Sequence, residues 1–73
     1  MRLQDCKQGA RVRVVQIHTG EALALRLKAL GLFQGEEAEI LRISPRKKVW
    51  LVETASATFA LGAEIAACVE VTA

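Results

Sequence analysis

Few residues in this chain of 73 have side chains that could hold a metal ion. His18, Cys6 and Cys68 are the only nitrogen and sulfur ligands of the type that zinc prefers. A structural zinc site needs four such ligands, commonly with cysteines two residues apart, and that spacing is absent. We therefore expect no metal site, and leave open a weak transition-metal contact at His18 or the cysteines.

Catalysis needs several reactive groups in one place, and the glutamates after residue 35 are the one candidate. Glu37 and Glu39 alternate along a predicted strand, so their carboxylates would share one face, as an acid–base pair requires. The plainer interpretation is a solvated strand edge. No histidine-paired nucleophile and no glycine-rich phosphate loop accompanies them. We expect no enzymatic activity, no catalytic residue and no cofactor.

The composition is that of one small folded domain over residues 1–73. Apolar residues make up 52% of the chain and charged residues 25%, and the net charge is only +2. Apolar runs such as 22–25 and 49–52 are far shorter than the roughly 20 residues of a membrane span. The N-terminus also lacks the apolar stretch of a signal peptide. We expect a cytoplasmic protein with two free thiols, or with a disulfide between its ends as the alternative.

Alternating apolar and polar residues predict about five short strands, over 10–18, 37–44, 48–53, 58–61 and 68–72. The alternation changes phase near Val15 and again at Leu41, which indicates a bulge or a strand covered on both faces. Bulges bend strands, and closure of a bent sheet removes the exposed edges that promote aggregation. The predicted fold class is mainly β: a small five-stranded barrel with one α-helix inserted after the first strand.

The inserted helix is predicted over residues 20–30. Three leucines share one of its faces: Leu23, Leu27 and Leu30. Gly31 suits the left-handed position that follows a helix, and Leu32 would then pack back on the last turn. Gln34 and Gly35 predict the centre of a tight turn with positive φ at the glycine.

Some apolar residues have no place in this scheme and indicate a surface for a partner. Leu25 lies opposite the leucine stripe, and Phe33 has no role in the turn. Trp50 lies in a strand that is apolar on both faces, so it is either covered within the monomer or meets a partner, where tryptophan is enriched. We predict a docking surface made by the helix, its C-terminal corner and these outliers: Leu25, Arg26, Leu32, Phe33 and Trp50.

The order of these motifs resembles the FeoA-type ferrous iron transport protein A family over roughly residues 3–71. The most specific part is the pattern Arg-Leu-x-x-Leu-Gly-Leu-x-x-Gly, here Arg26, Leu27, Leu30, Gly31, Leu32 and Gly35. The ending "FALGAEIAACVEV" is also similar to that of the family. Gln34 stands where the family usually has proline, and "RKK" replaces its Gly-Asp-Pro turn.

The resemblance implies an SH3-like barrel, soluble and cytoplasmic, that acts in bacterial ferrous iron uptake with the membrane GTPase FeoB. It implies an accessory or regulatory subunit, with neither catalytic nor iron-carrying residues, and we leave open weak self-association. A related domain ends the repressors of the diphtheria-toxin-repressor type, after a helix-turn-helix. Because the barrel is predicted to start directly at Met1, we expect no such DNA reader.

Two other functions stay open. Arg46, Lys47 and Lys48 form a basic hairpin turn close to Trp50, and basic residues beside an aromatic ring can bind nucleic acid. The other function is that of a metal-responsive regulatory domain. Protein docking is the preferred interpretation, with no nucleic acid and no direct membrane insertion expected.

Overall fold

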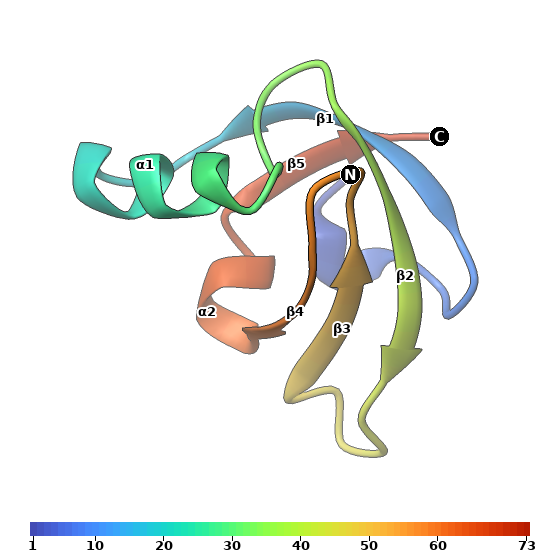
Figure 1. The fold of residues 1–73 in the computed structure, drawn as a ribbon. Coiled ribbons are helices and arrows are strands. Elements are labelled where there is room, and N and C mark those ends of the chain that lie inside the picture. The colour runs from blue at the N-terminus through green and yellow to red at the C-terminus, as the bar shows by residue number, and fades with distance from the viewer.

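The computed structural model describes all residues, 1–73, as one bent antiparallel sheet with two helices and a short 3₁₀ segment (Figure 1). The strands are β1 (Arg11–Ile17), β2 (Glu37–Ile43), β3 (Val49–Glu53), β4 (Thr58–Gly62) and β5 (Val69–Thr72). The helices are α1 (Glu21–Ala29) and α2 (Ala63–Ala66), and the 3₁₀ segment η1 (Leu3–Asp5) precedes β1. None of the helices is long and apolar enough to cross a membrane.

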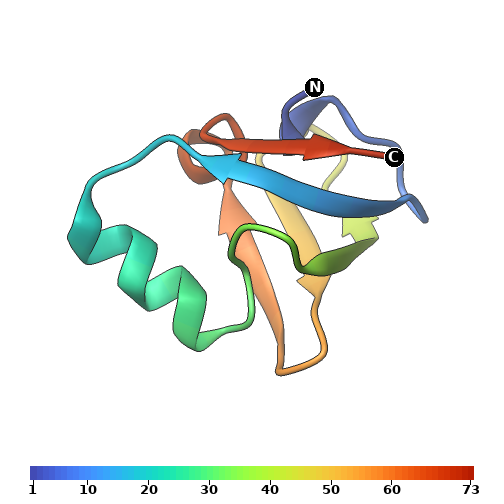
Figure 2. The ribbon, with the colours of Figure 1, turned by 90° about the horizontal axis from the view of Figure 1, so that it is seen from above.

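The sheet is bent at two interruptions of its pairing. The strand order is β4-β3-β2-β1-β5. The register shifts between Val14 and Gln16 where β1 pairs with β5, and between Ile40 and Arg42 where β2 pairs with β3. These shifts surround the two positions at which the sequence changes phase, so of the two predicted alternatives the structure supports an interruption of pairing, as a bulge produces. Figure 2 shows the resulting curvature of the sheet.

The mainly β fold with five strands and one helix after the first strand is confirmed, with one difference in how the barrel closes. β4 and β5 lie at the two ends of the strand order, and no ladder joins them. The short helix α2 connects these strands and packs on β3, β4 and η1. Because α2 occupies the space between the two edge strands, side-chain packing rather than backbone pairing closes this side.

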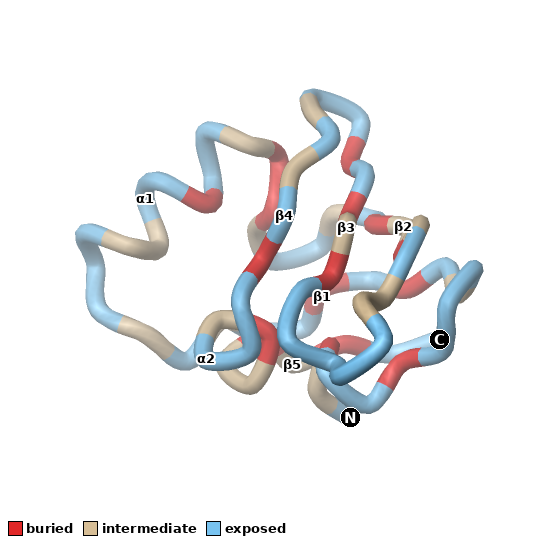
Figure 3. Tube along the Cα trace, turned by 90° about the horizontal axis from the view of Figure 1, so that it is seen from below, coloured by how far each residue is buried: buried red, intermediate tan, exposed pale blue.

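One apolar core fills the interior of the sheet. Its largest fully buried side chains come from the strands, from the N-terminal segment and from the end of α1: Leu3, Val14, Leu32, Ile40, Val52, Val69 and Val71. Buried and exposed residues alternate along β1 and β3, as half-buried strands require (Figure 3). Both cysteines are free thiols, and burial raises the pKa of the Cys6 thiol.

The N-terminal segment is part of this packing. The Met1 carbonyl accepts a hydrogen bond of 2.7 Å from the Val71 amide. The backbone of Arg2 forms an isolated antiparallel β-bridge with that of Glu70. Leu3 is completely buried. The first residues therefore continue the sheet beyond β5.

The end of α1 follows the predicted pattern. Gly31 has a φ of +85°, and its amide donates to the Lys28 carbonyl at 2.9 Å. The Leu32 amide donates to the Leu27 carbonyl, also at 2.9 Å. These two bonds define a Schellman end, in which the second residue after the cap packs against the last turn. Leu32 is accordingly buried beside Leu27 in the same core cluster.

The turn over residues 33–36 leads to a first prediction. Gly35 has a φ of +90°, and the Glu36 amide donates to the Phe33 carbonyl at 3.1 Å. The Gln34 amide makes no backbone hydrogen bond, so proline would lose none there. Gln34→Pro should raise the free energy of unfolding by about 0.4–1 kcal/mol, because proline restricts the unfolded chain. Urea denaturation measures this, and a loss of stability would show that Gln34 does not have the φ of proline.

Candidate protein-docking surface

A shallow groove lies beside α1, and we name it the α1 groove. It is lined by the end of β1, one side of α1 and the connection to β2: Gln16, Ile17, Glu21, Ala24, Leu25, Lys28, Phe33 and Gln34. Its volume is ≈ 270 Å³. The groove brings together Leu25 and Phe33, two of the predicted docking residues.

Local structure explains how these side chains meet. Glu21, Leu25 and Lys28 are spaced by one helical turn and therefore form one wall. The Schellman end at Gly31 redirects the chain, so that Phe33 lies beside the helix it has just left. Ile17 ends β1 after its bulge and forms part of the floor.

Two accessible apolar side chains, one exposed and one half-buried, distinguish this groove from an ordinary surface depression. Leu25 is 58% exposed, more than any other large apolar residue of the chain. Phe33 is half-buried. Leu25 projects outward because the opposite side of α1, with Leu27, faces the core. Phenylalanine is enriched in protein interfaces, whose centres are more apolar than the rest of a protein surface.

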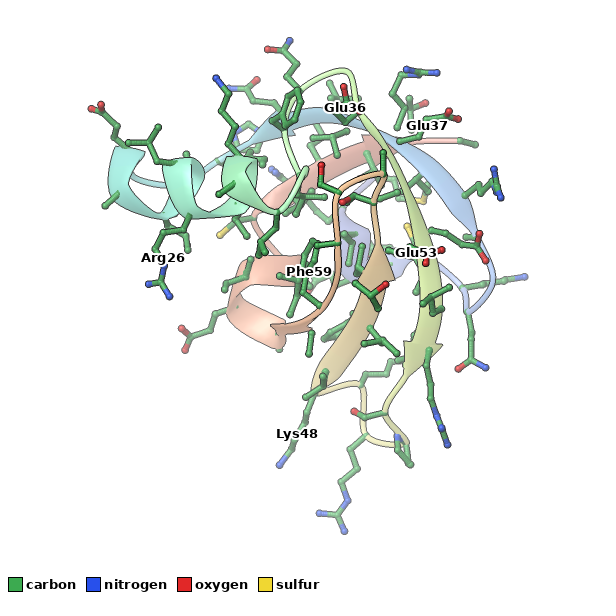
Figure 4. The ribbon with its side chains drawn as sticks, viewed as in Figure 1. Arg26, Glu36, Glu37, Lys48, Glu53 and Phe59 are labelled. Carbon is green, nitrogen blue, oxygen red and sulfur yellow. The ribbon has the colours of Figure 1, made fainter.

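Arg26 is exposed, as predicted, but it does not line the α1 groove. Figure 4 shows its side chain extending from the side of α1 that faces away from Glu36 and the α1–β2 connection. Lys28, two residues after Arg26, is the cation that borders the groove. The sequence analysis missed Lys28 and Ile17. The spacing of Lys28 from Leu25 and the second phase of β1 were the signals that could have identified them.

The prediction that Leu32 and Trp50 belong to the docking surface is wrong, because both side chains are buried. Leu32 is completely buried by its role in closing α1, and Trp50 is only 2% exposed. Trp50 faces the interior from β3, opposite Ile43 and Leu61 on the neighbouring strands. Covering within the monomer is therefore the correct alternative for Trp50. Its burial also leaves the hairpin residues 46–48 without the aromatic neighbour on which nucleic-acid stacking depended.

Glu37 and Glu39 are paired with arginines across the β1–β2 ladder. The distances are 3.8 Å for Arg13–Glu37 and 3.3 Å for Arg11–Glu39. Both pairs border a charged groove of ≈ 390 Å³. These are solvated ion pairs of a strand face, as the plainer interpretation of the glutamates expects.

His18 pairs with Glu70. His18 Nε2 lies 2.8 Å from Glu70 Oε1, and the hydrogen bond with His18 is the main cause that lowers the pKa of the Glu70 carboxyl. No group of three or more His, Cys, Asp or Glu side chains is arranged to hold a metal ion.

Comparison with known proteins places the chain in a family. The family model of the FeoA domain matches residues 1–73. The chain belongs to the FeoA domain family. The resemblance inferred from the motif around Gly31 is thereby confirmed, and membership connects the chain to ferrous iron transport. No curated protein sequence matches this chain significantly.

Solved structures support the same assignment. The FeoA protein of Chlorobium tepidum is 27% identical, with a TM-score of 0.89, over 97% of this chain and 68% of that one. The FeoA of Stenotrophomonas maltophilia, solved with zinc, is 29% identical, with a TM-score of 0.81, over 99% of this chain and 89% of that one. That protein is described as a prokaryotic SH3 domain protein and as a proposed activating factor of bacterial ferrous iron transport.

A similar fold occurs within a larger regulator. The metal-dependent transcriptional regulator MtsR has a TM-score of 0.85 at 22% identity, over 99% of this chain and 35% of that one. At this identity the likeness concerns the fold alone. This chain has the SH3-like fold that both groups share.

Proposed function

We propose that this FeoA protein is a cytoplasmic accessory subunit of bacterial ferrous iron uptake, which docks through the α1 groove on the cytoplasmic part of a FeoB-type membrane GTPase. The observation that carries the proposal is that exposed Leu25 and half-buried Phe33 line one groove. Its role is regulatory: it contributes contacts to the GTPase and leaves GTP hydrolysis and iron passage to that partner.

The make-up of the groove supports docking by a short protein segment. Apolar side chains (Ile17, Ala24, Leu25 and Phe33) are bordered by polar and charged ones (Gln16, Glu21, Lys28 and Gln34). An apolar centre with a polar rim is the usual anatomy of an interface. Burial in so small a groove leaves little free energy after the cost of association, so binding should be weak and reversible.

The charges near the groove define the partner further. Lys28 borders the groove and Arg26 lies on the other side of α1, so a segment that wraps around the helix meets both cations. An acidic group beside an apolar anchor would suit this arrangement. Regulation requires that the segment be displayed differently in the two nucleotide states of the GTPase, because binding shifts an equilibrium only by its difference in affinity.

The proposal predicts that Phe33→Ala and Leu25→Ala each weaken association by roughly 5- to 30-fold, as the loss of an interface anchor does. The measurement mixes this protein with the cytoplasmic part of the GTPase, with and without nucleotide, and records affinity and hydrolysis rate. Val49→Ala is the matched control, since Val49 is 42% exposed and does not line the groove. Equal binding by wild type and both groove variants would reject the groove as the docking site.

Loss of fold must be separated from loss of docking. Leu27→Ala truncates a core side chain and should lower the free energy of unfolding by about 2–5 kcal/mol. Phe33→Ala should cost much less, because Phe33 is only half-buried. If Phe33→Ala unfolds the domain as severely as Leu27→Ala, Phe33 is a core residue and its assignment to docking is wrong.

A further inference from the structure

The chain concentrates half of its positive charge at one end of the molecule. Five of its ten basic residues lie at or beside the β2–β3 hairpin: Lys7, Arg42, Arg46, Lys47 and Lys48. Lys7 joins the hairpin because the next residue, Gln8, accepts a hydrogen bond of 3.0 Å from the Ile43 amide. We name these five residues the basic tip.

No acidic side chain neutralises the basic tip. The three ion pairs of the structure involve Arg11, Arg13 and His18. Residues 40–52 contain no Asp or Glu. Four glutamates instead line the charged groove at the other end of the same strands: Glu36, Glu37, Glu39 and Glu53. Figure 4 shows Lys48 and the pair Glu36 and Glu37 at opposite ends of the molecule.

Hydrogen bonds to Ser44 close the hairpin that carries the tip. The Ser44 hydroxyl accepts hydrogen bonds from the Lys48 and Val49 amides, at 3.0 and 3.1 Å. The Lys47 amide donates to the Ser44 carbonyl at 2.9 Å. The turn that carries Arg46, Lys47 and Lys48 therefore has a hydrogen-bonded backbone, and binding through it costs little backbone order.

The surroundings of the charges indicate what they meet. The hairpin projects from the sheet as a convex end (Figure 1), which fits a flat surface better than a cleft. Pro45 is exposed and Val49 is 42% exposed, so apolar groups flank the cations. No exposed aromatic ring lies beside the tip for stacking on bases: Trp50 is buried, Phe59 packs against the core and Phe33 lies in the α1 groove.

We propose that the basic tip binds the anionic phospholipid headgroups of a membrane surface. Lysine and arginine side chains near such a surface each add to the attraction, and several of them together give useful binding. Pro45 and Val49 then rest against the interfacial layer without insertion of a helix or strand. The charged groove at the opposite end has four glutamates against two arginines, so its net negative charge is repelled and the molecule approaches the surface tip first. This proposal uses none of the residues of the α1 groove.

The test is co-sedimentation of the protein with vesicles. Vesicles of equal parts phosphatidylglycerol and phosphatidylcholine should bind it, and vesicles of phosphatidylcholine alone should not. Arg46→Gln/Lys48→Gln should weaken the partition by roughly 10- to 30-fold. The matched control is Arg26→Gln/Lys28→Gln, which removes the same two residue types from α1. It should change the partition by less than about threefold, because these charges lie away from the surface.

Three outcomes would overturn the proposal. Equal losses in the two double variants would show attraction by net charge alone, without a tip. Binding to phosphatidylcholine alone would show an apolar mode of association. Hairpin-dependent binding to RNA without binding to the anionic vesicles would assign the tip to nucleic acid. Circular dichroism should show both variants folded like the wild type, since all four residues are exposed.

Discussion

Gly31→Ala is expected to lower the free energy of unfolding by roughly 2–5 kcal/mol. The first cost comes from the backbone, because Gly31 has a φ of +85°, a region that disfavours residues with a Cβ. The second cost comes from a steric clash. A Cβ at this position would lie 2.5 Å from Thr54 Oγ1 and 3.0 Å from Ser56 Oγ. Gly31 is therefore needed both for its conformation and for the close approach of the β3–β4 connection.

Thr54 cannot move aside cheaply. It is 8% exposed, and its hydroxyl donates a hydrogen bond to the Leu30 carbonyl at the end of α1. The same oxygen accepts from the Ser56 and Ala57 amides, at 3.2 and 3.3 Å. A displaced hydroxyl would leave these partly buried groups without partners, which costs more than the bonds themselves contribute. The end of α1 and the β3–β4 connection should therefore lose order together.

The chain contains a matched control for this prediction. Gly35 has a φ of +90°, yet nothing lies within 4 Å of a Cβ placed there. Gly35→Ala thus carries the backbone cost alone, about 1–2 kcal/mol. Urea denaturation of the two variants separates the clash with Thr54 from the backbone term. Equal losses of stability would mean that Thr54 and Ser56 yield to the added methyl group without cost.

Trp50→Ala is the second change with a large expected effect, a loss of about 3–5 kcal/mol. Trp50 is 2% exposed and belongs to the single core cluster, so the truncation opens a cavity that the sheet cannot fill. For a domain whose size predicts a stability of roughly 4–11 kcal/mol, this is a large share. Thermal or urea denaturation followed by circular dichroism measures it.

Trp50→Phe should be much milder than Trp50→Ala. The indole Nε1 is buried and has no hydrogen-bond partner, so its removal relieves an unsatisfied donor while the ring is largely kept. A phenylalanine variant as unstable as the alanine variant would indicate that the indole nitrogen has a stabilising partner. Neither variant should alter the α1 groove, which Trp50 does not line.

Much of this fold could be predicted from local signals, because changes in the apolar pattern and glycines mark where its elements bend or end. The phase changes near Val15 and at Leu41 marked both bulges, since a bulge shifts every following side chain to the other face. Gly31 and Gly35 marked the two places with positive φ between α1 and β2. Each of these features depends on residues close in sequence, which is why the sequence alone was sufficient.

The predicted docking surface was wrong at Leu32 and Trp50 because exposure depends on residues distant in sequence. The run 49–52 is apolar in both phases, and only its register with β2 and β4 turns Trp50 inward and leaves Val49 outward. Leu32 has a local role in ending α1, and that role by itself requires burial, so its second assignment to docking was inconsistent with the first. The side of α1 that Arg26 takes depends on how the helix rests on the sheet, which no short pattern specifies.

The hydrogen bond from the Val71 amide to the Met1 carbonyl joins residues near the two ends of the chain. Because Leu3 lies two residues after Met1 and fills the core, separation of the N-terminal segment from β5 exposes the interior beside both ends of the chain. Fraying at the two ends is thus a single cooperative event. Amide protons on both sides of this junction would exchange with solvent at a common rate.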